Sequence, residues 1–369
     1  MTAHRVAVTG ANGFIGRNLM VRLGELGIEA VPLYRDSPRE AWFTAIANAD
    51  VVVHLAGANR PVDPADFMAV NHGTADVIAE AVKAAGRPVR IVYTSSSRVD
   101  EPTDYGRSKL AGEERLKALS QDTGSPVHVL RLPNVFGKWA RPNYNSAVAT
   151  FCHNIARDLP IQINDPASPL SLVYIDDVLA TLVAIVEGDV AGGMVAVEPV
   201  YHTTVGAVAD TITRFRQDRD DNLIDCVGTG LTRALYSTYV AALPLDKFSY
   251  PIAAHTDPRG SFSEMLKTRT SGQFSFFTAF PGVTRGGHYH HSKTEKFLIV
   301  KGTARFGFRH VVTGETHEII VSGDRPEIVE TVPGWAHDVT NIGDTDLISL
   351  LWANEIFDRA LPDTIAAKV

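Results

Sequence analysis

The distribution of apolar residues along the chain changes once, near residue 245. Before that point, short apolar runs alternate with stretches of helical periodicity, for example 51–55, 73–85, 90–93 and 109–119. Regular alternation of strand and helix is typical of βαβ units, whose parallel sheet is covered on both faces. We therefore predict an α/β, Rossmann-like, doubly wound parallel sheet over residues 1–245.

Beyond residue 245 the pattern is one of short strands. Apolar runs separated by turns that carry Gly and Asp lie at 274–277, 297–300, 317–321 and 347–351. No long helical stretch competes with them, which predicts an antiparallel all-β barrel or sandwich over residues 250–369. Prolines within 243–258 mark the boundary between the two domains.

Composition and charge narrow the range of partners. The chain has 369 residues, enough for about two domains, and a net charge of −7 without runs of like charge. This argues against a nucleic-acid or membrane partner, and no apolar stretch has the length of a membrane span. The strand-like run at 5–9 leaves no room for a signal peptide, and Cys152 and Cys226 form no CxxC pattern. We expect a cytoplasmic protein that acts on small molecules.

A glycine-rich segment, TGANGFIG at 9–16, stands between the first strand and a helix-like stretch at 17–26. Glycines let the backbone turn tightly and approach a pyrophosphate at the start of the helix. Arg35 follows the second strand, where an acidic residue would bind a free ribose 2′-hydroxyl, and so favours NADP; the alternative is a solvated surface cation. The cofactor contacts predicted in this segment are Gly10, Asn12, Gly13, Phe14, Ile15 and Gly16.

A second group of residues suggests proton transfer. Three serines at 95–97 follow a strand, and Tyr105 and Lys109 come four residues apart, on one face of a helix. A nearby ammonium lowers the pKa of a phenol, so that Tyr105 can exchange a proton with a substrate oxygen while nicotinamide exchanges a hydride. The alternative for Tyr105 and Lys109 is an ordinary helix surface.

A third group has the residue types and spacing of a metal site. His288 and His290 fall on one face of a strand, and Glu295 and His337 come from neighbouring segments. Three imidazoles and a carboxylate suit a divalent ion such as zinc, iron, manganese or nickel. The alternative is a set of locally satisfied histidines, as we expect for His291, His310 and His317.

The N-terminal 240 residues or so resemble the extended short-chain dehydrogenase/reductases that act on nucleotide sugars. The motifs that carry this likeness are DVVVHLAG at 50–57, NHGT at 71–74, RLPNVFG at 131–137 and YIDDV at 174–178. The resemblance implies that Tyr105 is the acid/base, that Lys109 binds the cofactor ribose, and that Ser96 holds the substrate carbonyl, with Ser95 and Ser97 as alternatives. It further implies cofactor contacts at Leu55, Ala56 and Gly57 and a substrate contact at Asn134.

One departure from that family bears on the reaction. Dehydratases place an acidic pair directly after the active-site serine, whereas this chain has Ser97 and Arg98 there. Reduction or epimerisation is therefore favoured over dehydration.

The C-terminal part resembles the cupins, and specifically an RmlC-like all-β cupin barrel. Residues 282–302 fit the first cupin motif without a gap, while the second motif, which contains His337, lacks one residue and a glycine. The phrase DPRGSF at 257–262 resembles the opening strand of cupin-type deoxysugar epimerases, where Arg259 would grip a diphosphate. The alternative for Arg259 is a local pair with Asp257 at a turn.

In this order the two domains resemble the CapF-type capsular polysaccharide enzymes, a likeness that RPNYNS at 141–146 and YSTY at 236–239 extend over the whole chain. The resemblance implies a bifunctional enzyme that epimerises C3 of a UDP-linked 4-keto-deoxysugar in the cupin domain and reduces C4 with NADPH. It also implies zinc and a homodimer. Tyr289, His291 and Lys296 stay open as the base that removes the C3 proton.

Two other functions stay open at the level of the sequence. In the first, the cupin domain is a non-catalytic module for sugar binding or dimerisation, attached to a simple C4 reductase. In the second, the whole chain is an NADPH-sensing regulator without turnover, against which the complete Ser-Tyr-Lys set argues.

Overall fold

A computed structural model describes residues 5–369, which form two compact units. Unit 1 runs to Ile212 and includes Ala234–Pro244, and unit 2 comprises Thr213–Arg233 and Leu245–Val369. The second unit thus takes in residues 213–233, which the hydrophobic periodicity assigns to the N-terminal domain. The limits 1–245 and 250–369 stay a prediction for the two functional domains.

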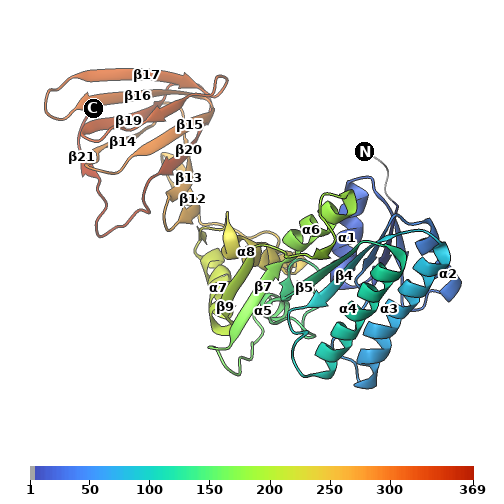
Figure 1. The fold of residues 1–369 in the computed structure, drawn as a ribbon. Coiled ribbons are helices and arrows are strands. Elements are labelled where there is room, and N and C mark those ends of the chain that lie inside the picture. The colour runs from blue at the N-terminus through green and yellow to red at the C-terminus, as the bar shows by residue number, and fades with distance from the viewer. Residues whose placement is uncertain (1–4) are drawn as a thin grey trace. The chain divides into compact units, whose positions relative to one another are not determined.

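Unit 1 is built on a six-stranded, all-parallel sheet with the order β2-β1-β3-β4-β5-β8 (Figure 1). Its strands are β1 (Arg5–Thr9), β2 (Glu29–Leu33), β3 (Val51–His54), β4 (Arg90–Ser96), β5 (Val127–Leu132) and β8 (Gly193–Met194). Every residue of β3 is buried, as expected of a strand that is covered on both faces. This confirms the predicted Rossmann-like sheet.

Helices cover both faces of that sheet. In chain order they are α1 (Phe14–Glu25), α2 (Arg39–Asn48), α3 (Ala65–Ala85), α4 (Asp104–Thr123), α5 (Ala147–Ile155) and α6 (Ile175–Glu187). The helices α2, α3 and α4 lie side by side over one face (Figure 1), where their buried side chains share a core with Ala7, Val52, Ile91 and Tyr93. On the other face α1 contacts α6. The carboxyl edge of the sheet is left for the loops that carry the candidate site.

A small second sheet completes unit 1. It has the order β6-β7-β9, formed by β6 (Asn134–Phe136), β7 (Pro169–Tyr174) and β9 (Val200–Thr204). Two helices, α7 (Val205–Asp220) and α8 (Gly230–Ala241), begin in one unit and end in the other.

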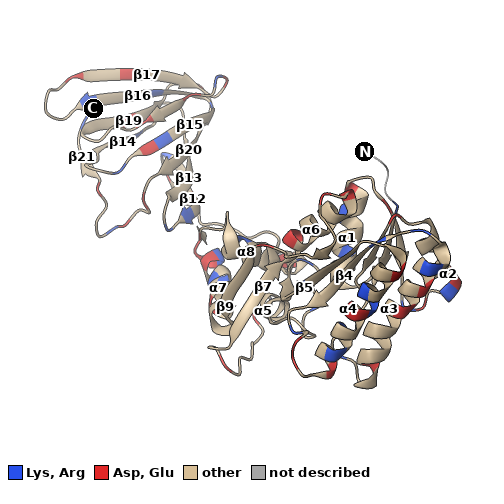
Figure 2. Ribbon diagram, in the orientation of Figure 1, with Lys and Arg blue, Asp and Glu red and all other residues tan. Residues whose placement is uncertain are grey.

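Charged residues of both signs are interleaved on the outer faces of α2, α3 and α4 (Figure 2). Ion pairs link these helices, as between Arg39 and Glu80 and, at 2.7 Å, between Lys83 and Asp122. Because such pairs are exposed, each contributes little to stability, on the order of 0–1 kcal/mol. The stability of this layer therefore comes from its buried apolar face.

Unit 2 is all-β apart from the ends of α7 and α8 and a short 3-10 turn, η1 (Leu245–Lys247). One sheet has the order β10-β12-β13-β20-β15-β18, with β11 paired to β12, and the other has the order β17-β16-β19-β14-β21. Their strands are β10 (Leu223–Ile224), β11 (His255–Asp257), β12 (Gly260–Thr268), β13 (Gly272–Ala279), β14 (Thr284–Tyr289), β15 (Glu295–Lys301), β16 (Thr303–His310), β17 (Thr316–Ser322), β18 (Ile328–Glu330), β19 (Trp335–Asn341), β20 (Leu347–Ala353) and β21 (Ile365–Ala366).

The two sheets of unit 2 enclose a single apolar core. Phe277, Phe297 and Leu347 of the first sheet pack with Phe306 and Val339 of the second. Alternate residues of β13 point inward, as the period of a strand requires. The four apolar runs predicted as strands lie within β13, β15, β17 and β20, so the all-β prediction for this part of the chain is confirmed.

Candidate functional site

The glycine-rich loop connects β1 to α1 in the predicted strand–loop–helix order. Gly10 has a φ of +66°, and a Cβ there would lie 2.7 Å from the amide nitrogen of Ala56. A Cβ on Gly16 would lie 2.2 Å from the carbonyl oxygen of Gly10. Both positions therefore require glycine, the first for its left-handed backbone and the second because α1 approaches the loop so closely. Gly13 precedes α1 and offers no side-chain cap, so the first N–H groups of α1 suit a pyrophosphate.

Arg35 lies two residues after β2, with an exposed side chain. The end of β2 adjoins the glycine loop, because Gly10 donates a hydrogen bond from its amide to the carbonyl oxygen of Leu33 (3.1 Å). Arg35 is thus at the carboxyl edge where the adenosine ribose of a dinucleotide lies in this fold.

The carboxyl end of β3 is tied to the same loop through a buried threonine. The hydroxyl of Thr9 accepts hydrogen bonds from the amides of Leu55 (3.1 Å) and Ala56 (3.2 Å). Because the oxygen of this hydroxyl already accepts two hydrogen bonds, Thr9 donates its hydroxyl proton to His54 Nδ1, 2.8 Å away. Burial, together with the charge of Lys109, lowers the pKa of His54 to about 3, so this imidazole is neutral at pH 7 and can accept that hydrogen bond. The bond orients the Thr9 hydroxyl, which in turn holds the amides of the loop after β3.

The loop after β3 packs against α3 and α4. Asn71 of α3 is fully buried, and its amide group exchanges hydrogen bonds with the main chain of Ala58 (2.8 and 3.1 Å) and donates to Ser108 Oγ (2.9 Å). A Cβ on Gly57 would lie 3.0 Å from Asn71 Oδ1 and 3.1 Å from Lys109 Nζ. A side chain at position 57 would therefore displace one of these groups, and the glycine keeps the predicted cofactor loop close to Lys109.

Tyr105 and Lys109 both lie in the first turns of α4. Lys109 is buried, and its ammonium donates to the carbonyl oxygen of Thr94 (3.1 Å) and lies 5.1 Å from the ring centroid of Tyr93. Burial lowers the pKa of Lys109 to about 8. Tyr105 is half-buried, with its ring edge against Phe67 at a centroid distance of 5.8 Å. The helix thus presents a phenol one turn from a partly desolvated cation.

The three serines have different surroundings. Ser95 donates a hydrogen bond of 2.5 Å to Glu113, which in turn pairs with Arg131 at 2.7 Å. Ser96 is buried, and its hydroxyl accepts a hydrogen bond from the main-chain amide two residues on (3.2 Å), which leaves its own proton for another acceptor. Ser97 is exposed. Of the three, Ser96 is the one whose position suits a bond to a substrate oxygen.

The two predicted substrate contacts have local partners. Asn134 is exposed at the start of β6 and donates to the carbonyl oxygen of Ser171 (3.1 Å). Arg259 lies in the turn between β11 and β12 and bonds Asp257 through Nε (3.0 Å) and Nη2 (2.5 Å). This pairing holds the pKa of Asp257 at about 2. The Arg259–Asp257 pair is the alternative that the sequence analysis gives for Arg259. The proposed contacts of Asn134 and Arg259 with the substrate stay predictions.

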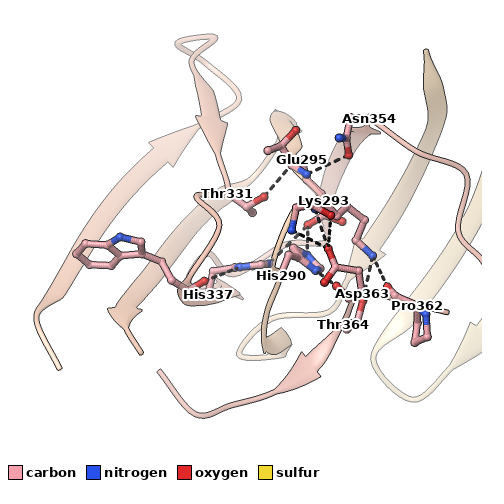
Figure 3. Close-up of polar contacts among 12 residues, drawn as sticks. His290, Lys293, Glu295, Thr331, His337, Asn354, Pro362, Asp363 and Thr364 are labelled. Carbon is pink, nitrogen blue, oxygen red and sulfur yellow. Dashed lines mark hydrogen bonds and ion pairs between the residues drawn. The ribbon is translucent and has the colours of Figure 1, made fainter. Parts of the chain in front are cut away.

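The four predicted metal ligands lie together inside unit 2. One ligand atom from each of His288, His290, Glu295 and His337 lies within 4.8 Å of the others. His288 and His337 face each other across the β14–β19 pairing, and Glu295 begins β15 in the opposite sheet. Glu295 Oε2 is 3.2 Å from His290 Nε2 and 3.5 Å from His337 Nε2 (Figure 3).

The protonation states of the cluster follow from its burial and its contacts. Burial alone would raise the pKa of Glu295, but its close contacts with the imidazoles of His290 and His337 outweigh it and lower the pKa to about 2. Burial and the neighbouring His337 and His290 lower the pKa of His288 to about 4. At pH 7 the cluster therefore offers an ionised carboxylate and a neutral imidazole lone pair at His288.

The imidazoles are also oriented as metal ligands are. His290 Nδ1 donates to the carbonyl oxygen of Asp363 (2.5 Å), and His337 Nδ1 lies 3.4 Å from that of Trp335. A carbonyl oxygen only accepts, so Nδ1 of each ring carries a proton and Nε2, which faces the carboxylate, is the nitrogen left to bind a metal ion. Among the described residues, His337 Nε2 is buried without a hydrogen-bond partner. The donor set and its supporting contacts fit a divalent transition metal.

Three charged residues of unit 2 escaped the sequence analysis. Arg285 of β14 packs its guanidinium over the core ring of Phe277, 5.3 Å from the centroid, and so points inward. Asp363 and Lys293 join the C-terminal segment to the turn after His290. The sequence could have pointed to Arg285, because it lies three residues before the predicted ligand His288. Nothing in the sequence around Asp363 indicates that it contacts this region.

The three candidates for the C3 base have contacts outside the cluster. Lys296 alternates with the inward-facing Glu295 and pairs with Glu330 of β18. His291 is exposed, and its ring contacts Tyr289 at a centroid distance of 5.4 Å. None of these contacts directs a proton-accepting atom into the cluster.

The fold and the two groups of residues are those of a nicotinamide-dependent type of enzyme joined to an all-β domain with a candidate metal site. Residues 6–197 match the model of the NAD dependent epimerase/dehydratase family, and residues 255–365 match that of the polysaccharide biosynthesis C-terminal domain. The first match supports the prediction of a nicotinamide cofactor.

Comparison with individual proteins is more specific. The chain is 55% identical over 367 residues to the UDP-2-acetamido-2,6-beta-L-arabino-hexul-4-ose reductase of Pseudomonas aeruginosa, covering 99% of each chain. The crystal structure of the capsular polysaccharide assembling protein CapF from Staphylococcus aureus superposes with a TM-score of 0.92 at 39% identity, over 99% of this chain and 100% of that one. The chain belongs to the CapF family of capsular polysaccharide enzymes, as its motifs predict. Within residues 5–369 no helix is both long and apolar enough to cross a membrane.

Proposed function

We propose that this chain converts a UDP-2-acetamido-2,6-dideoxy-4-hexulose in two steps, epimerisation at C3 in the C-terminal domain and reduction of the C4 ketone by NADPH in the N-terminal domain. The product would be the UDP-2-acetamido-2,6-dideoxy-L-talose, on the route to UDP-N-acetyl-L-fucosamine for capsule or O-antigen. The observation that carries this proposal is the end-to-end identity of 55% with a reductase of such a hexulose. We also propose that the reaction takes place in the cytoplasm, without a membrane or nucleic-acid partner.

For the reductase step, Tyr105 is the proton donor to the C4 oxygen as hydride arrives at C4. Lys109, buried beside the loop at Gly57, binds the nicotinamide ribose and favours ionisation of the phenol after transfer. Ser96 donates a hydrogen bond from its hydroxyl to the same C4 oxygen and keeps its proton, so that the only proton transferred comes from Tyr105. The glycine loop, from Gly10 to Gly16, and residues 55–57 hold the cofactor.

Arg35 selects NADPH by pairing with the 2′-phosphate of the adenosine ribose. Arg35→Asp reverses the charge at an exposed position, so folding should be unaffected while NADPH binding weakens by about 1–3 kcal/mol, roughly 5- to 150-fold in Kd. Binding of NADH should change much less. Fluorescence titration with both cofactors measures this, and Arg325→Asp, at an exposed arginine of unit 2, is the matched control. An unchanged preference would show that Arg35 is not the selector.

For the second domain we propose a cupin fold whose His288, His290, Glu295 and His337 hold a divalent metal, most simply zinc. The mixed nitrogen and oxygen donor set and the two Nδ1 contacts support this. Bound there, the metal supplies Lewis-acid stabilisation of the enolate that forms when C3 loses its proton. The side chains of the cluster hold it, and Arg285, with its inward guanidinium, is placed to meet negative charge on a substrate.

Homodimer formation has support from the outer face of the larger sheet of unit 2. Phe274 and Leu350, on the paired strands β13 and β20, are 43% and 41% exposed, and Ile328, on β18 beyond β15, is 53% exposed. Exposed apolar side chains that cluster in this way are typical of a protein–protein interface. A second copy of the chain is the partner that we propose.

The proposed function is tested with the full chain and the UDP-linked 4-keto sugar in D₂O. Without NADPH, the signal of the C3 proton should disappear from the NMR spectrum as the epimerase exchanges it with solvent. After addition of NADPH, one equivalent should be oxidised and the product should show the talo configuration at C3 and C4. Reduction without any C3 exchange would instead show that the C-terminal domain is a non-catalytic module, and no oxidation would remove the proposed reductase.

A further inference from the structure

The loop that carries His290 is held by a segment from the far end of the chain. The residues concerned, 362–367, follow a stretch without helix or strand at 354–361 and pair through β21 with β14. In that pairing His288 lies opposite Ala366 and Tyr289 opposite Ile365, and Ala367 donates its amide to the carbonyl oxygen of Gly287 (3.0 Å). The C-terminal segment therefore flanks the strand that carries one ligand and the turn that follows the next.

Asp363 is the centre of these contacts. Its carboxylate accepts hydrogen bonds from the amides of His291 (2.9 Å), Ser292 (2.9 Å) and Lys293 (2.8 Å), and from Ser292 Oγ (3.2 Å) (Figure 3). Its carbonyl oxygen accepts the Nδ1 proton of His290 at 2.5 Å. The backbone of Asp363 has a φ of +37°, which is unfavourable for a side-chain-bearing residue, although Asp tolerates it better than most. These contacts hold that conformation in place.

Lys293 closes the arrangement from the other side. It is 4% exposed, and its ammonium donates to the carbonyl oxygen of Pro362 (3.0 Å) and to Thr364 Oγ1 (3.0 Å), the neighbours of Asp363 on either side. A buried ammonium is costly unless its hydrogen bonds are satisfied, so Lys293 binds the segment firmly.

We propose that Pro362, Asp363 and Thr364, locked by Lys293, form a clamp that positions His290 as a metal ligand. The clamp fixes the proton of His290 on Nδ1, so that Nε2 has its lone pair toward the cluster, and it fixes the direction of the ring. His337 obtains its carbonyl partner two residues away on its own strand, whereas the partner of His290 comes from a segment 73 residues further along the chain. Metal affinity in this domain therefore depends on residues that are not ligands. The inference rests on the metal centre of the proposed function.

The test measures zinc affinity of the full-length chain by competition with a chromophoric chelator. Asp363→Ala removes the carboxylate that orders the turn, and it should weaken zinc binding by about 10- to 100-fold, the usual effect of losing a group that orients a ligand. Asp358→Ala, in the same tail but bonded only to a local amide, is the matched control and should bind zinc as the unaltered chain does. Asp363→Glu should restore part of the affinity.

A purely structural role is distinguished by the chelated protein. If Asp363 only stabilised the fold, Asp363→Ala would lower the unfolding temperature of the metal-free chain. Zinc affinity, measured well below that temperature, would then stay within about twofold of that of the unaltered chain. This result would overturn the clamp. Should Asp363→Ala not fold, Lys293→Met, which keeps the aliphatic chain and removes both ammonium bonds, is expected to weaken zinc binding at least fivefold, and an unchanged affinity would again overturn it. An unaltered chain that takes up no zinc would instead refute the metal centre itself.

Discussion

Replacing Tyr105 by Phe is expected to lower the rate of NADPH oxidation on the keto sugar by about 10²- to 10⁴-fold, the usual contribution of a positioned general acid. The ring and its edge contact with Phe67 are retained, since only the hydroxyl is lost. NADPH should still bind with nearly the Kd of the unaltered chain, because Lys109 and the glycine loop are unchanged. Stopped-flow absorbance at the nicotinamide band gives the rate, and fluorescence titration gives the affinity.

The matched control is Tyr250→Phe, which removes a phenol hydroxyl from a tyrosine in unit 2 whose ring lies 4.3 Å from the guanidinium carbon of Arg219. It should leave the reduction rate unchanged. The exchange of the C3 proton with solvent should continue in Tyr105→Phe, since it needs no hydride. A variant at position 105 that oxidises NADPH at the original rate would refute the assigned acid.

His290→Ala is expected to separate the two proposed activities. His290 is the most buried member of the cluster, 2% exposed, and it contacts both Glu295 and the Asp363 carbonyl, so its loss removes a ligand and a hydrogen bond of the clamp. Zinc content after purification should fall below about a tenth of the original, and C3 exchange should fall by at least 10²-fold. Reduction of a substrate that is already epimerised should stay within about twofold, because Tyr105 and Lys109 belong to unit 1.

Elemental analysis measures the zinc, and NMR in D₂O measures the exchange. His255→Ala, an exposed histidine of β11, is the control and should keep both. If His290→Ala retained a full complement of zinc, the proposed ligand set would be wrong. If it lost zinc and kept C3 exchange, the metal would be structural and the epimerase would need another explanation.

Local pattern was enough to predict most of unit 1. Its strands are short apolar runs, its helices are periodic, and the glycine at 16 is required by a contact near in sequence, with the carbonyl oxygen of Gly10. Such local constraints are legible without knowledge of the fold. The same holds for the strands of β13, β15, β17 and β20.

The difference between the three serines is visible only in the tertiary structure, and the role of Ser96 stays a prediction. Ser95, Ser96 and Ser97 are equivalent in a linear motif, and the difference arises from Glu113, 18 residues on, which accepts the proton of Ser95. The sequence is equally unable to decide among the candidates for the C3 base. Lys296 is adjacent in sequence to the predicted ligand Glu295, but strand alternation directs its side chain outward, where it pairs with Glu330.

What the sequence by itself determined is the class of each domain and the residue types of both candidate sites, because spacing along one strand or helix decides which side chains share a face. Only the tertiary structure decided that the four predicted ligands lie within 4.8 Å of one another, and that Asp363 contacts His290 from 73 residues away. Those contacts join segments whose separation along the chain carries no periodic signal. They exist because two sheets close on a common core and bring the C-terminal segment to the edge of β14.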